Sequence, residues 1–90
     1  MSNINVIFNK RGKTITIQAK TDMMFIELAM KYAQKVGVDL EKDQIKFIFN
    51  SMELVTTTHK DLGELGIRDM AKIDVVVGKD VIGAITFKYI

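Results

Sequence analysis

The sequence predicts a single α+β domain in which one long helix lies across a β-sheet. Three observations support this fold class. Two β-favouring runs, residues 4–8 and 13–19, surround a turn. An apolar stripe at helical spacing follows in residues 25–36. Three further β-favouring runs end at residue 77, so we expect the order strand-strand-helix-strand-strand-short helix-strand within residues 1–80.

The domain is expected to open with a β-hairpin. Residues 4–8 are rich in β-branched and aromatic side chains, which favour strands. In residues 13–19 apolar and polar side chains alternate, as they do in a strand with one buried face. The intervening residues 9–12 favour a turn, since Gly12 can adopt a positive φ angle.

The long helix is the most regular element of the sequence. Spacings of three and four residues place its apolar side chains on one face, which is expected to pack against the sheet. Thr21 and Asp22 are expected to cap the N-terminus of the helix. Gly37 is expected to end the helix in the left-handed conformation. The apolar face consists of Phe25, Leu28, Ala29, Tyr32, Ala33 and Val36.

The second half of the domain is expected to add three strands. Residues 45–49 and 52–55 are predicted to form a hairpin around a tight turn at residues 50–51. Residues 72–77 are predicted to form the last strand, with Ile73, Val75 and Val77 on one face.

A short helical turn is expected before that last strand, in residues 61–65. Gly66 can adopt the left-handed conformation that ends such a turn. Ile67 follows directly and is expected to point into the core. The preceding residues 56–59 contain three threonines and are expected to form a loop.

Two apolar groups remain outside these elements. Met23, Met24, Ile26 and Met30 lie off the helical stripe, and we expect another part of the chain to cover them. The alternative is an adaptable, methionine-rich binding surface. Residues 81–90 form a second apolar run that would favour aggregation if it were exposed. We predict that this extension packs on the domain or on a partner, as an added strand or in a peptide groove.

Composition narrows the classes of function. The net charge of +2, with acidic and basic residues interspersed, does not favour nucleic acid as a partner. No apolar run approaches the roughly 18 residues that span a bilayer, so neither a membrane partner nor a signal peptide is expected. The absence of cysteine excludes disulfides and thiolate catalysis, and it fits an intracellular location, cytoplasmic or nuclear.

Catalysis has no support in the residue pattern. His59 is the only histidine; it lies in a threonine-rich loop, and no Asp or Ser stands at a telling spacing from it. Asp39, Glu41 and Asp43 lack the ordered spacing of a calcium loop. We therefore expect solvated loops at both places, no enzyme activity, no metal and no cofactor.

Beyond the element order, particular stretches resemble ubiquitin and, more closely, the small ubiquitin-like modifiers of the SUMO branch. Residues 12–16 (GKTIT) and 43–49 (DQIKFIF) are similar to ubiquitin's second and third strands. Residues 28–38 (LAMKYAQKVGV) and 62–67 (LGELGI) resemble SUMO segments. The resemblance covers residues 4–77. It implies a β-grasp (ubiquitin-like) roll and a role in protein–protein interaction.

The sequence departs from the family where conjugation takes place. Conjugated members end in Gly-Gly after processing, because glycine lets the tail thread a narrow enzyme channel. Here Gly78 is followed by Lys79 and Asp80, and the sequence contains no Gly-Gly pair. The resemblance without this pair favours a module that is not conjugated.

The apolar patch of ubiquitin is only partly kept. Ile48 and Val76 align with it and form a secondary apolar patch, while Asp74 stands where ubiquitin has a histidine. Met52 replaces the lysine that ubiquitin uses most for chain formation. These changes make ubiquitin-receptor binding through this face a poor prediction.

The resemblance also implies a peptide groove between the second strand and the helix. SUMO proteins bind short apolar peptides there, and the peptide adds to the sheet as a strand. Lysines beside the groove would attract acidic residues that flank such peptides. The alternative is that the apolar members are core and the lysines a solvated face. The matching residues are Thr16, Ile17, Gln18, Lys20, Leu28, Lys31, Tyr32 and Lys35.

Three functions follow as hypotheses. The first is a non-conjugated, SUMO-like module that binds partner proteins and belongs to a larger protein. The second is a modifier precursor or variant that becomes attached to targets. The third is a structural domain that docks on neighbours or self-associates through residues 81–90.

Overall fold

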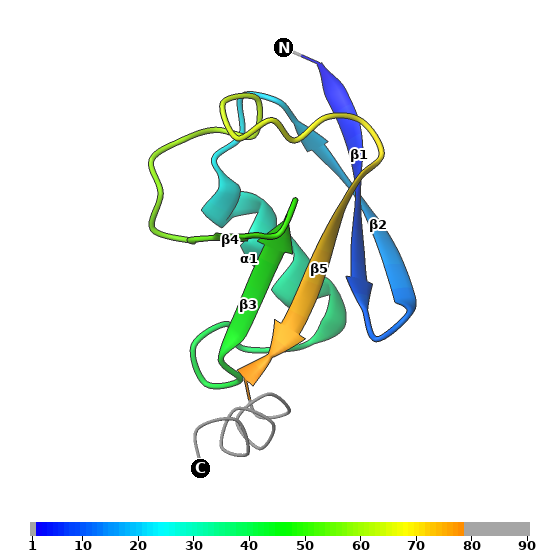
Figure 1. Ribbon diagram of the computed structural model, residues 1–90, viewed down its shortest axis with the longest axis vertical. Helices are drawn as coiled ribbons and strands as arrows, with labels where there is room; N and C mark the ends of the chain where they lie inside the picture. The colour runs from blue at the N-terminus through cyan, green and yellow to red at the C-terminus, as the bar shows by residue number, and fades with distance from the viewer. Residues whose placement is uncertain (1, 79–90) are drawn as a thin grey trace.

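The computed structural model describes residues 2–78, in which a five-stranded mixed sheet is covered on one face by a single helix (Figure 1). This arrangement confirms the predicted α+β, β-grasp class. None of the helices in residues 2–78 is both long and apolar enough to cross a membrane. The elements are β1 (Asn3–Lys10), β2 (Lys13–Lys20), α1 (Phe25–Val36), β3 (Ile45–Phe49), β4 (Met52–Leu54) and β5 (Ala71–Val77).

The strand order β2-β1-β5-β3-β4 leaves β2 and β4 at the two edges of the sheet. β1 and β2 form the predicted antiparallel hairpin, and β3 and β4 form the second one. The central pair, β1 and β5, is parallel. Because parallel strands run the same way, the β1–β2 turn and the end of β5 lie at the same end of the molecule (Figure 1).

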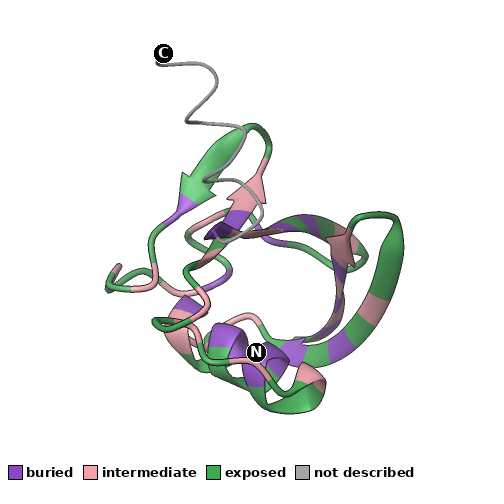
Figure 2. Ribbon diagram, turned by 90° about the horizontal axis from the view of Figure 1, so that it is seen from below, coloured by how far each residue is buried: buried purple, intermediate pink, exposed green. Residues whose placement is uncertain are grey.

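The core lies between the sheet and α1 and is centred on aromatic rings. Figure 2 shows buried positions that alternate with exposed ones along the strands. The ring of Phe47 meets the rings of Phe8, Phe25 and Tyr32 edge-on, at centroid distances of 5.4 to 5.9 Å. Phe8 stacks on Tyr32 at 4.6 Å. Ile67 is 1% exposed, which confirms its predicted inward position.

The predicted N-terminal cap of the helix is wrong. The helix begins at Phe25 and its N-cap is Met24, whose backbone N–H donates to the carboxylate of Glu27 at 3.4 Å. Thr21 is used elsewhere, because its hydroxyl accepts the N–H of Ser2 at 3.2 Å. Asp22 lies two residues before the N-cap residue Met24, so it is not the N-cap either.

Residues 61–63 explain why α1 starts late. The N–H groups of Leu62 and Gly63 donate to the carbonyls of Met23 and Thr21, both at 2.9 Å. These bonds hold residues 21–24 in a non-helical conformation, so no earlier residue can join the helix. This pairing joins segments far apart in the sequence, which is why local cap signals could not reveal it.

Two predicted turns have the expected backbone. Gly37 ends α1 with φ 76° and ψ 38°, and its N–H donates to the carbonyl of Ala33 at 2.9 Å. Gly66 has φ 79° and follows a single hydrogen-bonded turn rather than a regular helix. In that turn Asp61 and Glu64 accept each other's backbone N–H groups at 2.8 and 3.0 Å, as in a capping box.

The two apolar groups outside the predicted elements have different outcomes. The extension, residues 81–90, lies outside the described residues, and so does its predicted packing. Met23 packs partly against the core, as expected for a covered side chain. Met30 is 60% exposed, so no part of residues 2–78 covers it in the expected way.

Candidate functional site

The edge strand β2 presents backbone groups that no other strand of residues 2–78 pairs. The Nζ atom of Lys31 donates to the carbonyl of Gln18 at 3.2 Å, so this carbonyl faces away from β1. In an antiparallel pair, backbone groups two residues apart point the same way. The N–H and carbonyl groups of Thr16 and Lys20 therefore also face outward. An extended peptide could pair with this edge.

A hollow of about 430 Å³ lies beside this edge, between β2 and α1. A second hollow of about 310 Å³ adjoins it toward the start of α1. Gln18 and Lys31 line both. The Lys31–Gln18 hydrogen bond therefore divides one groove into two parts. The first hollow is lined by Thr16, Ile17, Gln18, Lys31, Gln34 and Lys35, and the second by Asn3, Gln18, Ala19, Lys20, Met23 and Lys31.

Six of the eight predicted groove residues line these hollows, and the other two do not. Leu28 is fully buried and Tyr32 is 3% exposed, so both belong to the core and neither offers its side chain to the groove. Ile17, at 6% exposure, contributes little surface. The predicted apolar lining is thus thinner than the resemblance implies. The binding role of these residues stays a prediction.

Sequence reasoning missed four lining residues, Asn3, Ala19, Met23 and Gln34. Gln34 could have been found, because it stands three positions after Lys31 on the same helical face. Asn3 and Met23 carry no such signal, since they reach the groove only through the pairing of β1 with β2 and the turn after β2.

The groove has a positive rim. Lys20, Lys31 and Lys35 line it and are exposed, and no acidic residue is among those that line the two hollows. Tyr32 lines neither hollow, and burial raises the pKa of its phenol above the ordinary value. Acidic side chains near an apolar peptide would be favoured here.

The secondary apolar patch lies on another face. Ile48 and Val76 are partly exposed on the strands β3 and β5, where Ile48 is opposite Asp74 and Val76 is opposite Lys46. Each apolar residue is thus paired with a charged one across the strands. This leaves a small, interrupted patch rather than a continuous apolar surface.

The remaining candidates form no site in the described chain. His59 is exposed. Asp39 accepts the N–H groups of Glu41 and Lys42 at 3.0 and 2.9 Å, while Asp43 accepts the N–H of Asp39. These carboxylates therefore stabilise a turn. No group of three potential ligands that could hold a metal is found within residues 2–78.

The comparisons with known proteins agree with the fold. A family model described as "Ubiquitin-2 like Rad60 SUMO-like" matches residues 4–77. Among curated proteins, no significant match is found.

Solved structures show the same fold at low identity. A designed protein based on ubiquitin has a TM-score of 0.69 and 24% identity, and the match covers 83% of this chain and 88% of that one. A ubiquitin-like domain of an Arabidopsis thaliana protein has a TM-score of 0.74 and 18% identity, with 86% and 79% covered. ATBAG1, crystallised in complex with HSP70, has a TM-score of 0.71 and 17% identity, with 96% and 48% covered.

Proposed function

The chain belongs to the family of Rad60 SUMO-like, ubiquitin-like domains, and from this premise we propose that it is a non-conjugated module that binds partner proteins. The observation that carries the proposal is the open edge of β2 beside a lysine-rimmed groove. The partner is a short apolar peptide with acidic flanks, which adds to β2 as a further strand. We further propose that the module acts inside the cell as part of a larger protein, without catalytic activity.

In strand addition, the edge of β2 and the two hollows have different roles in binding the peptide. The outward backbone groups of Thr16 and Gln18 pair with the peptide backbone, while peptide side chains enter the two hollows. The hydrogen bond from the Lys31 ammonium group to the carbonyl of Gln18 must first break. An acidic side chain on the peptide can form an ion pair with that ammonium group, which offsets the loss of a hydrogen bond worth about 1 kcal/mol. Acidic flanks thus favour both approach and docking.

The end of the domain supports a non-conjugated role. Gly78, the last described residue, is buried, and its N–H donates to the carbonyl of Gln44 at 2.8 Å. A Cβ atom at this position would clash with Gln44. Close packing therefore accounts for this lone glycine, with no need for the flexible Gly-Gly end of a modifier. A protein partner is also in keeping with ATBAG1, a structural neighbour solved in complex with HSP70.

A titration followed by amide NMR tests the peptide groove. The probe is a peptide with four apolar residues followed by three aspartates, and the control peptide has asparagines in place of the aspartates. We expect shifts at residues 16–20 and 31–35, and weaker binding of the control. The proposal fails if millimolar probe leaves these amides unchanged.

A thioester assay with an activating enzyme separates this function from that of a modifier. We expect no adduct with the full chain or with a chain trimmed after Gly78. An adduct with either form would establish the modifier instead.

A further inference from the structure

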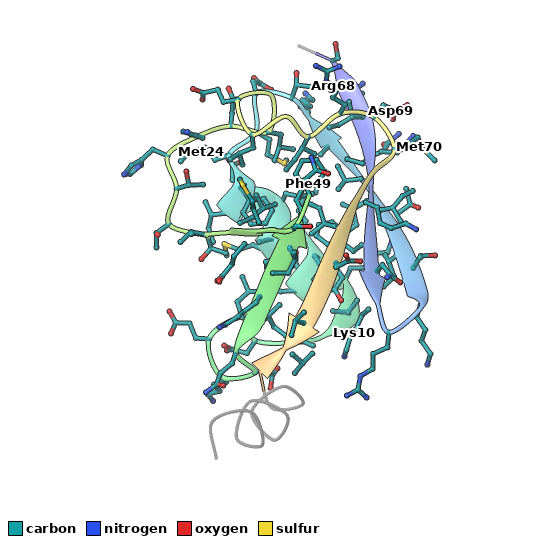
Figure 3. The ribbon with its side chains drawn as sticks, in the orientation of Figure 1. Lys10, Met24, Phe49, Arg68, Asp69 and Met70 are labelled. Atoms are coloured by element: carbon teal, nitrogen blue, oxygen red, sulfur yellow. The ribbon has the colours of Figure 1, made fainter. Side chains whose placement is uncertain are left out.

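A third hollow lies away from the groove, at the end of the sheet where β1 turns into β2. Its volume is about 380 Å³, and none of its lining residues lines either part of the groove. Figure 3 labels Lys10 at this end of the molecule. We call this hollow the hairpin pocket. Its lining residues are Phe8, Lys10, Arg11, Lys13, Ile15, Tyr32, Val36 and Val38.

The hairpin pocket combines an apolar floor with a basic rim. Ile15, Val36 and Val38 are partly exposed, and the first two pack against the core, so they offer apolar surface at fixed positions. Lys10 and Lys13 flank the hairpin turn above this floor. No residue that lines the pocket is acidic. An apolar group with a nearby negative charge would match both parts.

The phenol of Tyr32 adds a hydrogen-bond donor to the pocket. The structure shows no hydrogen bond from this phenol to any residue of the described chain. In that same range, no fully buried side-chain oxygen lacks a partner. The phenol oxygen must therefore reach solvent, although the residue as a whole is only 3% exposed. The hairpin pocket is the hollow that Tyr32 lines.

We propose that the hairpin pocket binds a protein segment in which a carboxylate stands beside an apolar side chain. The apolar side chain covers Ile15 and Val38, which removes apolar surface from water. The carboxylate interacts with Lys10 and Lys13 and accepts the phenol of Tyr32. The C-terminus of α1 opposes an anion with roughly half an elementary charge, and the cations of the rim outweigh it. A bare phosphate would leave the apolar floor unused.

This second contact would let one partner engage both the groove and the hairpin pocket, or let two partners bind together. It stands independently of the proposed groove, because the two share no lining residue. Failure of one can therefore be told from failure of the other by which amides respond.

The test is an amide NMR titration of the full chain with acetyl-Asp-Leu-Asp-amide, and with acetyl-Asn-Leu-Asn-amide as control. We expect shifts at residues 10–15, Val36 and Val38 with the aspartate peptide, and binding at least threefold weaker with the asparagine peptide. Equal binding of both peptides, or shifts confined to residues 16–20, would overturn the proposal.

Variants locate the interaction within the pocket. Lys10→Gln with Lys13→Gln should weaken binding of the aspartate peptide roughly two- to tenfold, whereas Lys60→Gln with Lys72→Gln removes the same charge elsewhere and should have little effect. Tyr32→Phe keeps the stacked ring and should weaken binding about two- to fivefold. Equal losses in both lysine pairs would show a general charge effect and overturn the assignment. The amide spectrum of each variant verifies that it is folded.

Discussion

The two edges of the sheet differ in length and in what protects them. β2 has eight residues and runs beside α1 with lysines at both of its ends. β4 has three residues and offers little backbone for pairing. Proteins prevent unwanted edge-to-edge pairing either by shortening an edge strand or by placing lysines along it. The short edge uses the first means and the long edge uses the second.

The difference indicates which edge is available for function. The long edge strand β2 lies beside a groove. Its Gln18 carbonyl accepts a hydrogen bond from the side chain of Lys31 rather than from another strand. The Lys31 ammonium group can leave when a better partner arrives. None of the three hollows described above is lined by a residue of β4. We therefore expect peptide binding at β2 and not at β4.

The largest expected effect tests whether both edges depend on one core. Phe47→Ala removes the ring that contacts Phe8, Phe25 and Tyr32, and should lower the free energy of unfolding by about 3–5 kcal/mol. Chemical denaturation measures this loss, and hydrogen exchange should show β2 and β4 amides losing protection together. Phe49→Ala, at a partly exposed position, should cost less. Retained protection of β2 alone would show that the edges are stabilised separately.

The second largest expected effect tests whether peptide binding depends on the outward N–H groups of β2. Thr16→Pro removes an outward N–H from β2 and should weaken binding of an apolar peptide at least tenfold, or about 1.4 kcal/mol. Stability should change little, because an outward N–H has no partner in the sheet. Calorimetric titration measures the binding.

Glu53→Pro is the matched control for that change. Residue 53 lies opposite Ile48, one pair beyond the turn, so its N–H also faces outward, but from β4. Peptide binding should be unaffected. A loss of similar size in both variants would contradict the assignment of the site to β2.

A smaller effect concerns the lysine that covers the long edge. Lys31→Met keeps the length of the side chain but frees the carbonyl of Gln18. A neutral apolar peptide should then bind about two- to fivefold more tightly, while a peptide with acidic flanks should lose affinity by a similar factor. Lys35→Met removes a charge without touching this carbonyl and should weaken only the acidic peptide. If both peptides respond alike to Lys31→Met, the side chain does not gate the edge.

The smallest expected effect concerns the ionisation of the buried Tyr32 phenol. Burial raises the folded-state pKa of Tyr32 above the ordinary value of 10.0. Below about pH 10 the phenol is protonated in both states, so it adds no pH dependence. Above that pH the unfolded state ionises first, and stability is lost until the pH passes the folded-state pKa. Unfolding in urea on both sides of about pH 10 should show a shallower loss for Tyr32→Phe than for the original chain. Equal slopes would contradict the prediction.

Periodicity in the sequence was enough to predict the strands, the helix and the core. Alternation in β2 and three-four spacing in α1 report which side of an element is buried, because the backbone geometry sets those periods. Phe25, Leu28 and Tyr32 accordingly face the sheet. Gly37 was predictable for the same local reason, since only the backbone angles of one turn are involved.

Only the tertiary structure decided where distant segments meet. The start of α1 is set by residues 61–63, which no local cap signal in residues 21–24 reveals. The depth of Leu28 and Tyr32, the bond from Lys31 to Gln18 and the hairpin pocket depend on how α1 lies over β2. Sequence patterns determine the side on which a residue is buried. Contacts between distant elements determine how deeply it is buried and which partner it finds, and they arise only when the whole chain packs.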